Sequence, residues 1–267
     1  MTKKIKVALC LPWYQGAHRD VSAQMLTLFN YFGKLSERLR YLNSQRPLSE
    51  SQWYLDWLPK LDPYDPTGDA EVTLDMVGTE IEFSIADQMG CSLIGLARER
   101  CVDVALGWEA DYVFFFDSDM HVPTSAFLKL LRNDVPIVAA LAFTGRDPIT
   151  PVVYKAEEIY EPDPEREGEG LIHFDYSPVL HYEKDALQQV DAIGSGVMLI
   201  KAEVFKQIKK PWFYTVGVGE DIYFCLRAKR EGIPVYVDTR VKTPHLMTYS
   251  GWQTEAKYLE RVEREGL

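Results

Sequence analysis

The segment that most constrains the fold is an apolar run ending in two aspartates, Asp-Tyr-Val-Phe-Phe-Phe-Asp-Ser-Asp over residues 111–119. Five consecutive apolar side chains without alternation are typical of a strand buried on both faces, as in a parallel sheet covered by helices. Similar apolar runs at residues 3–12 and 136–143 predict two more such strands. Because ligands of open α/β sheets gather just beyond the carboxyl ends of the strands, Asp117 and Asp119 are expected at a binding site.

Helical periodicity separates these strands. The predicted helices span residues 21–40, 89–106, 124–132, 202–208 and 220–230, and the further predicted strands span residues 71–77, 152–155, 171–174, 189–193, 197–200 and 234–237. Strands that alternate with helices are typical of a doubly wound α/β fold. We therefore expect residues 1–267 to form a single domain, with a mixed, mainly parallel sheet flanked by helices and a small antiparallel excursion.

Three segments depart from this alternation. Residues 45–69 hold four Trp and Tyr side chains among four prolines, an insertion too aromatic for a disordered loop. Residues 157–170 are strongly acidic and predict a solvated loop. Residues 253–267 alternate charges at helical spacing and predict a C-terminal helix.

Composition narrows the function classes. The net charge of −11 disfavours nucleic acid as a partner and favours small molecules, glycans or proteins. No stretch approaches the roughly 20 apolar residues that a membrane-spanning helix needs, so we expect no transmembrane segment and a cytoplasmic location. The four cysteines are predicted to be free buried thiols, with a disulfide as the alternative.

The aspartate pair indicates a metal site. Asp117 and Asp119 would repel each other side by side, and a divalent cation satisfies both. Oxygen ligands favour Mg²⁺ or Mn²⁺, which typically also coordinate substrate phosphates. The alternative is that the pair merely caps the helix predicted to begin near Thr124.

A second acidic group opens the helix at residues 220–230. Two glycines, Gly217 and Gly219, precede Glu220 and Asp221, and the helix dipole there would stabilise both carboxylates. One of these carboxylates could instead act as a general base toward an attacking hydroxyl. His245 follows the last predicted strand, and it is a candidate site residue only in combination with the two acidic groups.

Two further features could approach a ligand. Gly194, Ser195 and Gly196 lie between apolar runs, where small residues indicate a tight turn or a simple strand break. Arg98 and Arg100 lie in the helix before the Asp-Ser-Asp strand, where a guanidinium could approach a diphosphate or pair with an exposed acid.

Taken in order, these motifs resemble the GT-A-fold glycosyltransferases, particularly the family-2-like branch with an Asp-x-Asp motif and a Rossmann-like sheet. The resemblance covers residues 3–249, except for the insertion and the acidic loop. It depends on the order of the motifs rather than on any one of them. They are Leu11-Pro12-Trp13-Tyr14, Leu96-Ala97-Arg98, Phe116-Asp117-Ser118-Asp119, Gly194-Ser195-Gly196-Val197, Gly219-Glu220-Asp221 and His245.

The resemblance implies a metal-dependent transferase that moves one sugar from a UDP- or GDP-sugar to an acceptor hydroxyl. The acceptor would be a glycan, a glycoconjugate or a small molecule. Its implied nucleotide-binding residues are Pro12, Tyr14, Arg98, Asp117 and Ser118, and its implied sugar- or acceptor-binding residues are Gly194, Ser195, Gly196 and Trp212. Asp117, Asp119 and His245 would hold Mn²⁺ or Mg²⁺. Glu220 or Asp221 would face the acceptor, with Asp221 as the general base of an inverting reaction, although retaining members share the same motif.

Two alternative functions stay open. A sugar-nucleotide pyrophosphorylase needs a glycine-rich basic loop after the first strand, whereas residues 11–19 contain one glycine and one arginine. A non-catalytic glycan-binding protein would explain the aromatic insertion, with the acids holding a structural Ca²⁺. We also hypothesise that residues 45–69 fold over the cleft as part of the acceptor site, the alternative being that their aromatic side chains pack on the body of the domain.

Overall fold

The computed structural model describes residues 3–12, 19–44, 73, 75–88, 90–145, 147–162, 170–247 and 251–267. The predicted insertion at residues 45–69 lies outside these ranges, as do Tyr14 and residues 163–169 of the acidic segment.

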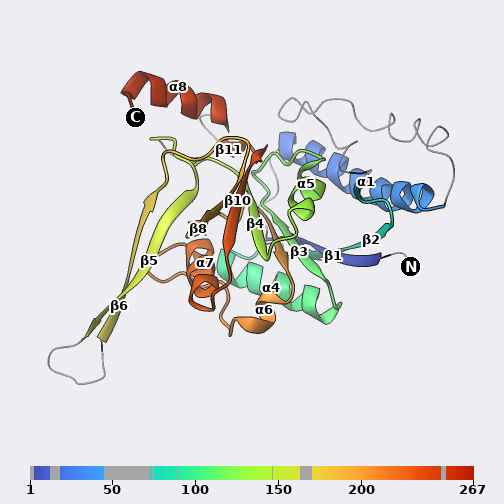
Figure 1. Ribbon diagram of the computed structural model, residues 1–267, viewed down its shortest axis with the longest axis horizontal. Helices are drawn as coiled ribbons and strands as arrows, with labels where there is room; N and C mark the ends of the chain where they lie inside the picture. Colours follow the sequence, from blue (N-terminus) through green and yellow to red (C-terminus); the bar gives the residue numbers. More distant parts are fainter. Residues whose placement is uncertain are drawn as a thin grey trace.

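A mixed sheet forms the centre of the fold (Figure 1). It has seven strands in the order β2-β1-β3-β9-β4-β10-β7. Its strands are β1 (Lys3–Leu11), β2 (Thr79–Asp87), β3 (Tyr112–Phe116), β4 (Ile137–Leu141), β7 (Leu187–Val190), β9 (Val197–Lys201) and β10 (Val235–Lys242). Strands β1, β2, β3, β4 and β10 run in one direction, whereas β9 and β7 are antiparallel to their neighbours. The predicted mixed, mainly parallel sheet is therefore confirmed.

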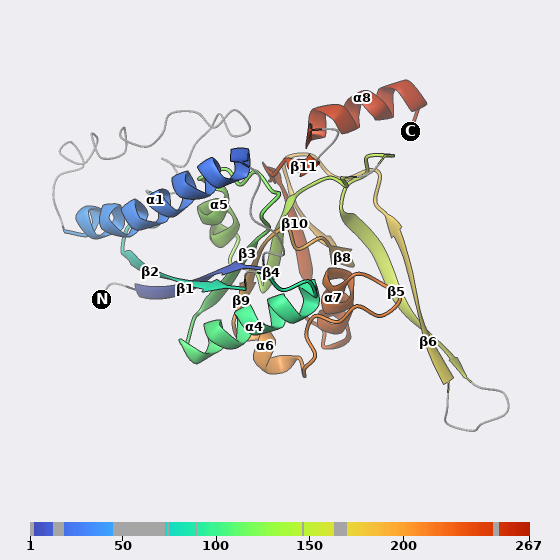
Figure 2. The ribbon, with the colours of Figure 1, turned by 180° about the vertical axis from the view of Figure 1, so that it is seen from behind.

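Helices cover both faces of this sheet (Figures 1 and 2). They are α1 (Arg19–Leu42), α4 (Ile94–Gly107), α5 (Ala126–Arg132), α6 (Val204–Gln207), α7 (Glu220–Arg230) and α8 (Glu255–Glu265). One hydrophobic cluster holds α1 and α5, and the other holds α4, α6 and α7. Successive residues of β3 enter opposite clusters, with Phe115 in one and Phe114 and Phe116 in the other. This is why the strand needs an unbroken apolar run.

A small antiparallel sheet supplies the predicted excursion. It contains β5 (Val153–Pro162), β6 (Gly170–Pro178) and β8 (Ala192–Ile193), in the order β6-β5-β8. The β5–β6 hairpin projects from the body of the molecule (Figure 1). A second short pair, β11 (His245–Met247) and β12 (Gly251–Gln253), precedes α8.

Three predicted segments differ from the structure. The strand expected at residues 189–193 is split between β7 and β8, which belong to different sheets. The second strand was expected at residues 71–77 but lies at Thr79–Asp87, because residues 76–78 form a turn in which Gly78 has a φ of 93°. Its alternating sequence, Thr-Glu-Ile-Glu-Phe-Ser-Ile, is the signal of a half-buried edge strand. The acidic segment begins as strand rather than loop, because β5 continues to Pro162 in register with β6.

Composition also led to expectations about the cysteines and about membrane-spanning helices. The four cysteines are free, as predicted, and three of them are buried, whereas Cys91 is only half-buried. None of the described helices combines the length and the apolar character of a membrane-spanning segment.

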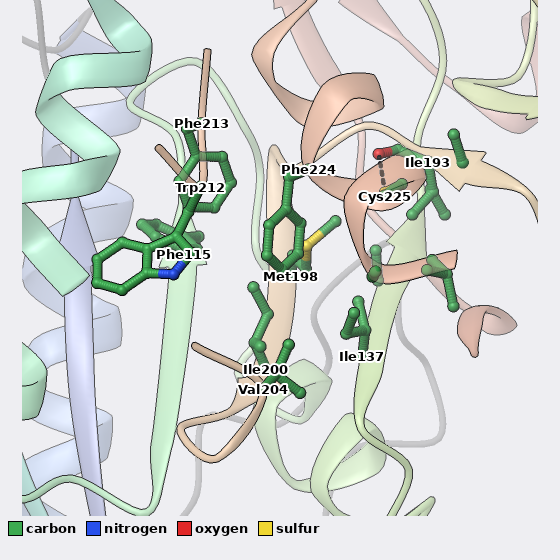
Figure 3. Packing of buried hydrophobic residues seen from close by; sticks show 14 of the residues in the cluster. Phe115, Ile137, Ile193, Met198, Ile200, Val204, Trp212, Phe213, Phe224 and Cys225 are labelled. Carbon is green, nitrogen blue, oxygen red and sulfur yellow. Dashed lines mark hydrogen bonds between the residues drawn. The ribbon is translucent and has the colours of Figure 1, made fainter. Parts of the chain in front are cut away.

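Stacked aromatic rings fix α7 against the sheet (Figure 3). The Phe224 ring lies 4.7 Å from that of Phe213 and 5.6 Å from that of Phe205, measured between ring centroids. The indole N–H of Trp212 donates to the carbonyl oxygens of Phe205 and Ile208. Helix α7, which begins with Glu220 and Asp221, is therefore held by close packing rather than by surface contacts.

Removing the Phe224 ring should destabilise the fold. The side chain is fully buried, so Phe224→Ala is expected to lower the free energy of unfolding by about 3–5 kcal/mol. Urea denaturation monitored by circular dichroism would measure the change. The exposed Leu96→Ala serves as the control, with an effect within about 0.5 kcal/mol. A similar effect of both variants would contradict this account of α7.

Candidate active site

The candidate site lies at the edge of the sheet where the parallel strands end. Three backbone hydrogen bonds bring separate segments together there. Asp117 N–H donates to the Gly196 carbonyl at 2.8 Å, His121 N–H to the Pro244 carbonyl at 2.8 Å, and Leu246 N–H to the Asp119 carbonyl at 2.7 Å. The Asp-Ser-Asp segment therefore lies between the turn before β9 and the segment after β10.

Arg98 joins two acidic groups from distant parts of the chain. Its Nη2 donates to Asp117 Oδ2 at 2.9 Å, and its Nε donates to Glu220 Oε1 at 3.2 Å. The Arg98 side chain is only 2% exposed. Burial alone would lower the guanidinium pKa, but the charges of Asp117 and Glu220 outweigh it and raise that pKa. Arg98 is therefore a buried, permanently charged link between α4, the end of β3 and the start of α7.

Asp117 is nevertheless hard to ionise. Burial raises the pKa of its carboxyl to about 6, and the charges of Asp119 and Glu220 act in the same direction, against the lowering by Arg98. The carboxylate keeps one buried oxygen, Oδ1, without a hydrogen-bond partner among the described residues.

Asp119 and His245 form the outer pair of the site. His245 Nε2 lies 3.1 Å from Asp119 Oδ2, and His245 Nδ1 lies 3.1 Å from the carbonyl oxygen of Phe143. The Phe143 carbonyl accepts a hydrogen bond from Nδ1–H, which leaves Nε2 facing the carboxylate. Burial would lower the imidazole pKa, but the hydrogen bond to Asp119 and its charge raise it above its ordinary value.

Asp221 occupies a space that glycines keep open. A Cβ at Gly219 would lie 2.7 Å from Asp221 Oδ1, and a Cβ at Gly194 would lie 3.7 Å from Asp221 Oδ2. Burial raises the Asp221 pKa to about 6, the Glu220 charge adds to the shift, and Arg98 opposes it. Oδ1 also accepts from the Ile222 N–H at 2.8 Å, which fixes the carboxylate at the start of α7.

The turn before β9 contacts the same group. A Cβ at Gly196 would lie 3.2 Å from the sulfur of Met120, so a side chain there would require the Met120 side chain to shift. Ser195 is 1% exposed, and its hydroxyl has no hydrogen-bond partner within the described residues. Close approach of the backbone, rather than a simple strand break, accounts for these small residues.

The structure thus brings together most of the residues singled out in the sequence. Pro12 is buried where β1 ends, and Ser118 is half-buried between the two aspartates. Trp212 lies apart, because its indole is 5% exposed and packs in the core beneath α7 (Figure 3), so its ring is closed to a sugar face. Arg100 is exposed, on a different side of α4 from Arg98.

Two features of the site were not predicted from the sequence. The pairing of Arg98 with Glu220 joins residues 122 positions apart, and no local pattern signals it. The orientation of His245 by the Phe143 carbonyl depends on the neighbouring β4 and β10 strands, which a single sequence does not pair.

The donor set fits a divalent cation. Within the described residues no three His, Cys, Asp or Glu side chains form a preformed metal cluster, since Asp117 turns its Oδ2 toward Arg98. Asp119, His245 and the unpaired Oδ1 of Asp117 still offer two carboxylates and an imidazole, a set that suits Mn²⁺ or Mg²⁺ together with substrate phosphates. The four carboxylates at the site outnumber Arg98 and His245, and a cation would balance this excess.

Comparison with known proteins gives only distant likenesses. No family model matches the chain, and no curated protein matches it. Among solved structures it is similar to A197 from STIV, with 15% identity and a TM-score of 0.46 over 91% of this chain and 86% of that one. It is also similar to a CMP:2-keto-3-deoxy-manno-octonic acid synthetase complexed with CTP, with 13% identity and a TM-score of 0.33 over 99% of this chain and 100% of that one. Likenesses this distant assign neither a family nor an activity to the chain.

Removing the Arg98 guanidinium should cost stability. In Arg98→Met, Asp117 and Glu220 lose their shared buried counter-charge, so we expect a loss of about 3–5 kcal/mol in the free energy of unfolding near neutral pH. Arg132→Met removes an exposed ion pair with Asp75 and should change stability by at most about 1 kcal/mol. Chemical denaturation of both variants checks this, and equal effects would argue against the buried link.

Proposed function

We propose that this chain is a metal-dependent glycosyltransferase of the GT-A type, which transfers one sugar from a UDP- or GDP-sugar to an acceptor hydroxyl. The observation that carries the proposal is the meeting of two acidic groups at one edge of the sheet. Asp117 and Asp119 lie beside His245, while Asp221 lies in a glycine-lined space on the other side of Arg98. A transfer reaction needs these two functions, one for a leaving diphosphate and one for an attacking hydroxyl.

On the donor side, Asp119, His245 and Asp117 Oδ1 would hold Mn²⁺ or Mg²⁺. The metal, when bound, supplies Lewis-acid stabilisation of the charge that develops on the leaving diphosphate. Pro12, Tyr14 and Ser118 are proposed to contact the nucleotide. Because Arg98 is buried and paired, we assign it the role of positioning Asp117 rather than of touching the phosphates directly.

On the acceptor side, Asp221 is proposed as the general base. A carboxyl group whose pKa is about 6 is ionised near neutral pH, yet it holds a proton better than an ordinary aspartate. Glu220 is engaged by Arg98, so it positions the start of α7 while Asp221 accepts the proton. Gly194 borders Asp221, whereas Met120 fills the space beside Gly196, so the sugar is proposed to lie beside Asp221 rather than against the backbone of Gly196. A base on the face opposite the leaving group would make the reaction inverting.

Nucleotide binding tests the donor side. UDP, GDP, CDP and TDP should be screened by thermal shift, each with and without Mn²⁺. A diphosphate present at 100 times its dissociation constant should stabilise the wild type by about 2.7 kcal/mol, and this shift should need the metal and disappear in Asp119→Asn. Asp134→Asn, an exposed aspartate at the other end of the sheet, should keep the full shift.

The same screen separates the alternatives. A shift with CTP, UTP, GTP or TTP but with none of the diphosphates would identify a sugar-nucleotide pyrophosphorylase instead. The absence of any nucleotide shift would overturn the transferase proposal.

The pH dependence of turnover tests the acceptor side. At saturating Mn²⁺, which would hold Asp117 ionised, Asp221 is the group that titrates near pH 6. Below that pH its carboxyl is protonated and cannot accept a proton, so kcat/KM should rise about tenfold per pH unit up to pH 6 and then level off. The rate can be measured as release of the nucleoside diphosphate from the sugar-nucleotide that binds, with water as the acceptor. Asp221→Asn should lower kcat by about 10²–10⁴-fold and retain the nucleotide shift.

The control for this variant is Asp191→Asn, which changes a partly exposed aspartate paired with Lys229 in the last turn of α7, at the other end of the helix from Asp221. It should leave the rate and its pH profile unchanged. An unchanged rate in Asp221→Asn would show that another group acts as the base.

A further inference from the structure

A group of aromatic side chains lies on the hairpin and the start of α7, outside the residues assigned above. It consists of Tyr154, Phe174 and Tyr176 from the β5–β6 hairpin, Tyr223 from α7 and Tyr214 from the segment before it. We refer to these five residues as the aromatic patch.

The strand register places the three hairpin residues on one face. Ala156 pairs with Tyr176 and Glu158 pairs with Phe174, so these side chains share the face of Tyr154, two residues before Ala156. The rings form two groups, one of Tyr154 with Tyr176 and the other of Phe174, Tyr223 and Tyr214. Their centroids are 5.8 Å apart for Tyr154 and Tyr176, 6.5 Å for Phe174 and Tyr223, and 6.0 Å for Tyr214 and Tyr223.

The hairpin is held in this position by contacts with α7 and the loop before it. Arg230 pairs with Glu158, which lies on the same face as the patch. A Cβ at Gly217 would lie 3.5 Å from the Phe174 ring, so the loop touches the ring closely. The patch is therefore a fixed surface shared by two elements.

The aromatic patch is continuous with the proposed base. Tyr154 pairs with Ala192 of β8, which leads directly to Gly194, and Asp221 lies against Gly194. Burial and the charge of Asp221 together raise the Tyr154 pKa to about 12, as expected for two side chains close to each other. Tyr223 follows Asp221 by two residues in α7.

Part of the aromatic patch is open to solvent. Tyr176 is 45% exposed and Tyr214 is 53% exposed, more than a core role would leave. Beyond them, Tyr160 and Ile172 continue the same face of the hairpin and are more than half exposed. An apolar surface that begins at a reactive carboxylate and runs outward is typical of a binding surface.

We propose that the aromatic patch binds a neutral oligosaccharide, which is the acceptor whose terminal hydroxyl faces Asp221. The flat C–H face of a sugar ring packs on an aromatic ring, and two groups of rings on one surface suit more than one sugar unit rather than one small acceptor. The adjoining acids Glu220 and Asp221 and the net charge of −11 would repel an anionic chain. This inference rests on the proposed function, because it takes Asp221 as the base.

Binding of oligosaccharides of increasing length tests the proposal. Glucose, mannose and galactose and their neutral oligomers up to hexasaccharides would be titrated by saturation-transfer NMR and calorimetry. We expect affinity to rise with chain length for at least one series. Tyr176→Ala and Tyr214→Ala should each weaken binding of the longest oligomer roughly two- to tenfold, because each removes one stacking ring.

Leu171→Ala and Ile159→Ala are matched controls, since both side chains are exposed on the opposite face of the same hairpin. They should leave oligosaccharide affinity unchanged. Absence of binding, affinity independent of chain length, or equal losses in the controls and the Tyr variants would each overturn the inference.

The thermal shift caused by a nucleoside diphosphate is measured independently of oligosaccharide binding, so the two proposals can fail separately. A normal diphosphate shift in a protein that binds no oligosaccharide leaves the transferase proposal standing and removes the acceptor assignment. Length-dependent, Tyr176-dependent binding in a protein without any nucleotide shift supports the patch and makes the chain a glycan-binding protein.

Discussion

The site depends on one buried guanidinium. Arg98 bonds to Asp117 at the end of β3 and to Glu220 at the start of α7, two carboxylates that would otherwise face each other across an acidic space. Without this link, the buried carboxylates would repel each other, and only the packing of α7 would oppose that repulsion. Arg98 therefore sets both the position of the Asp-Ser-Asp segment and the position of the helix that carries Asp221.

One guanidinium does not neutralise the whole group. The pKa values of Asp117 and Asp221 both rise to about 6, mainly through burial, although Arg98 opposes each shift. The two shifts have different consequences under the proposed function. Near Asp117 the remaining negative charge and the unpaired Oδ1 suit a cation, whereas Asp221, fixed by the Ile222 N–H and bordered by glycines, suits proton transfer. The same excess of acid thus serves two purposes on the two sides of Arg98.

Most of the sheet could be predicted because a strand buried on both faces has a continuous run of apolar residues in the sequence. The run Tyr112–Phe116 is apolar throughout, since its residues enter two cores, and α7 was predicted with the bounds that it has. Strand β2 was misplaced because an edge strand is only half-buried and its alternation is a weaker signal. The pairing of Arg98 with Glu220 and the burial of Trp212 could not be predicted, because both depend on which distant segments lie side by side.

The relation between the two halves of the site depends on the register of β9. This strand lies antiparallel between β3 and β4, and Phe116 pairs with Val197, so Gly196 lies opposite Asp117. Met198 and Ile200 enter one core, whereas Val197 and Leu199 enter the other. A slip by one residue would exchange these faces and bury each set on the wrong side, so the register is strongly determined. Because the glycine turn and β8 precede β9 directly, the same register places the hairpin and its aromatic patch on the Asp221 side. Under the proposed function, the core packing of one short strand would thereby fix where an acceptor lies relative to Asp117 and Asp119.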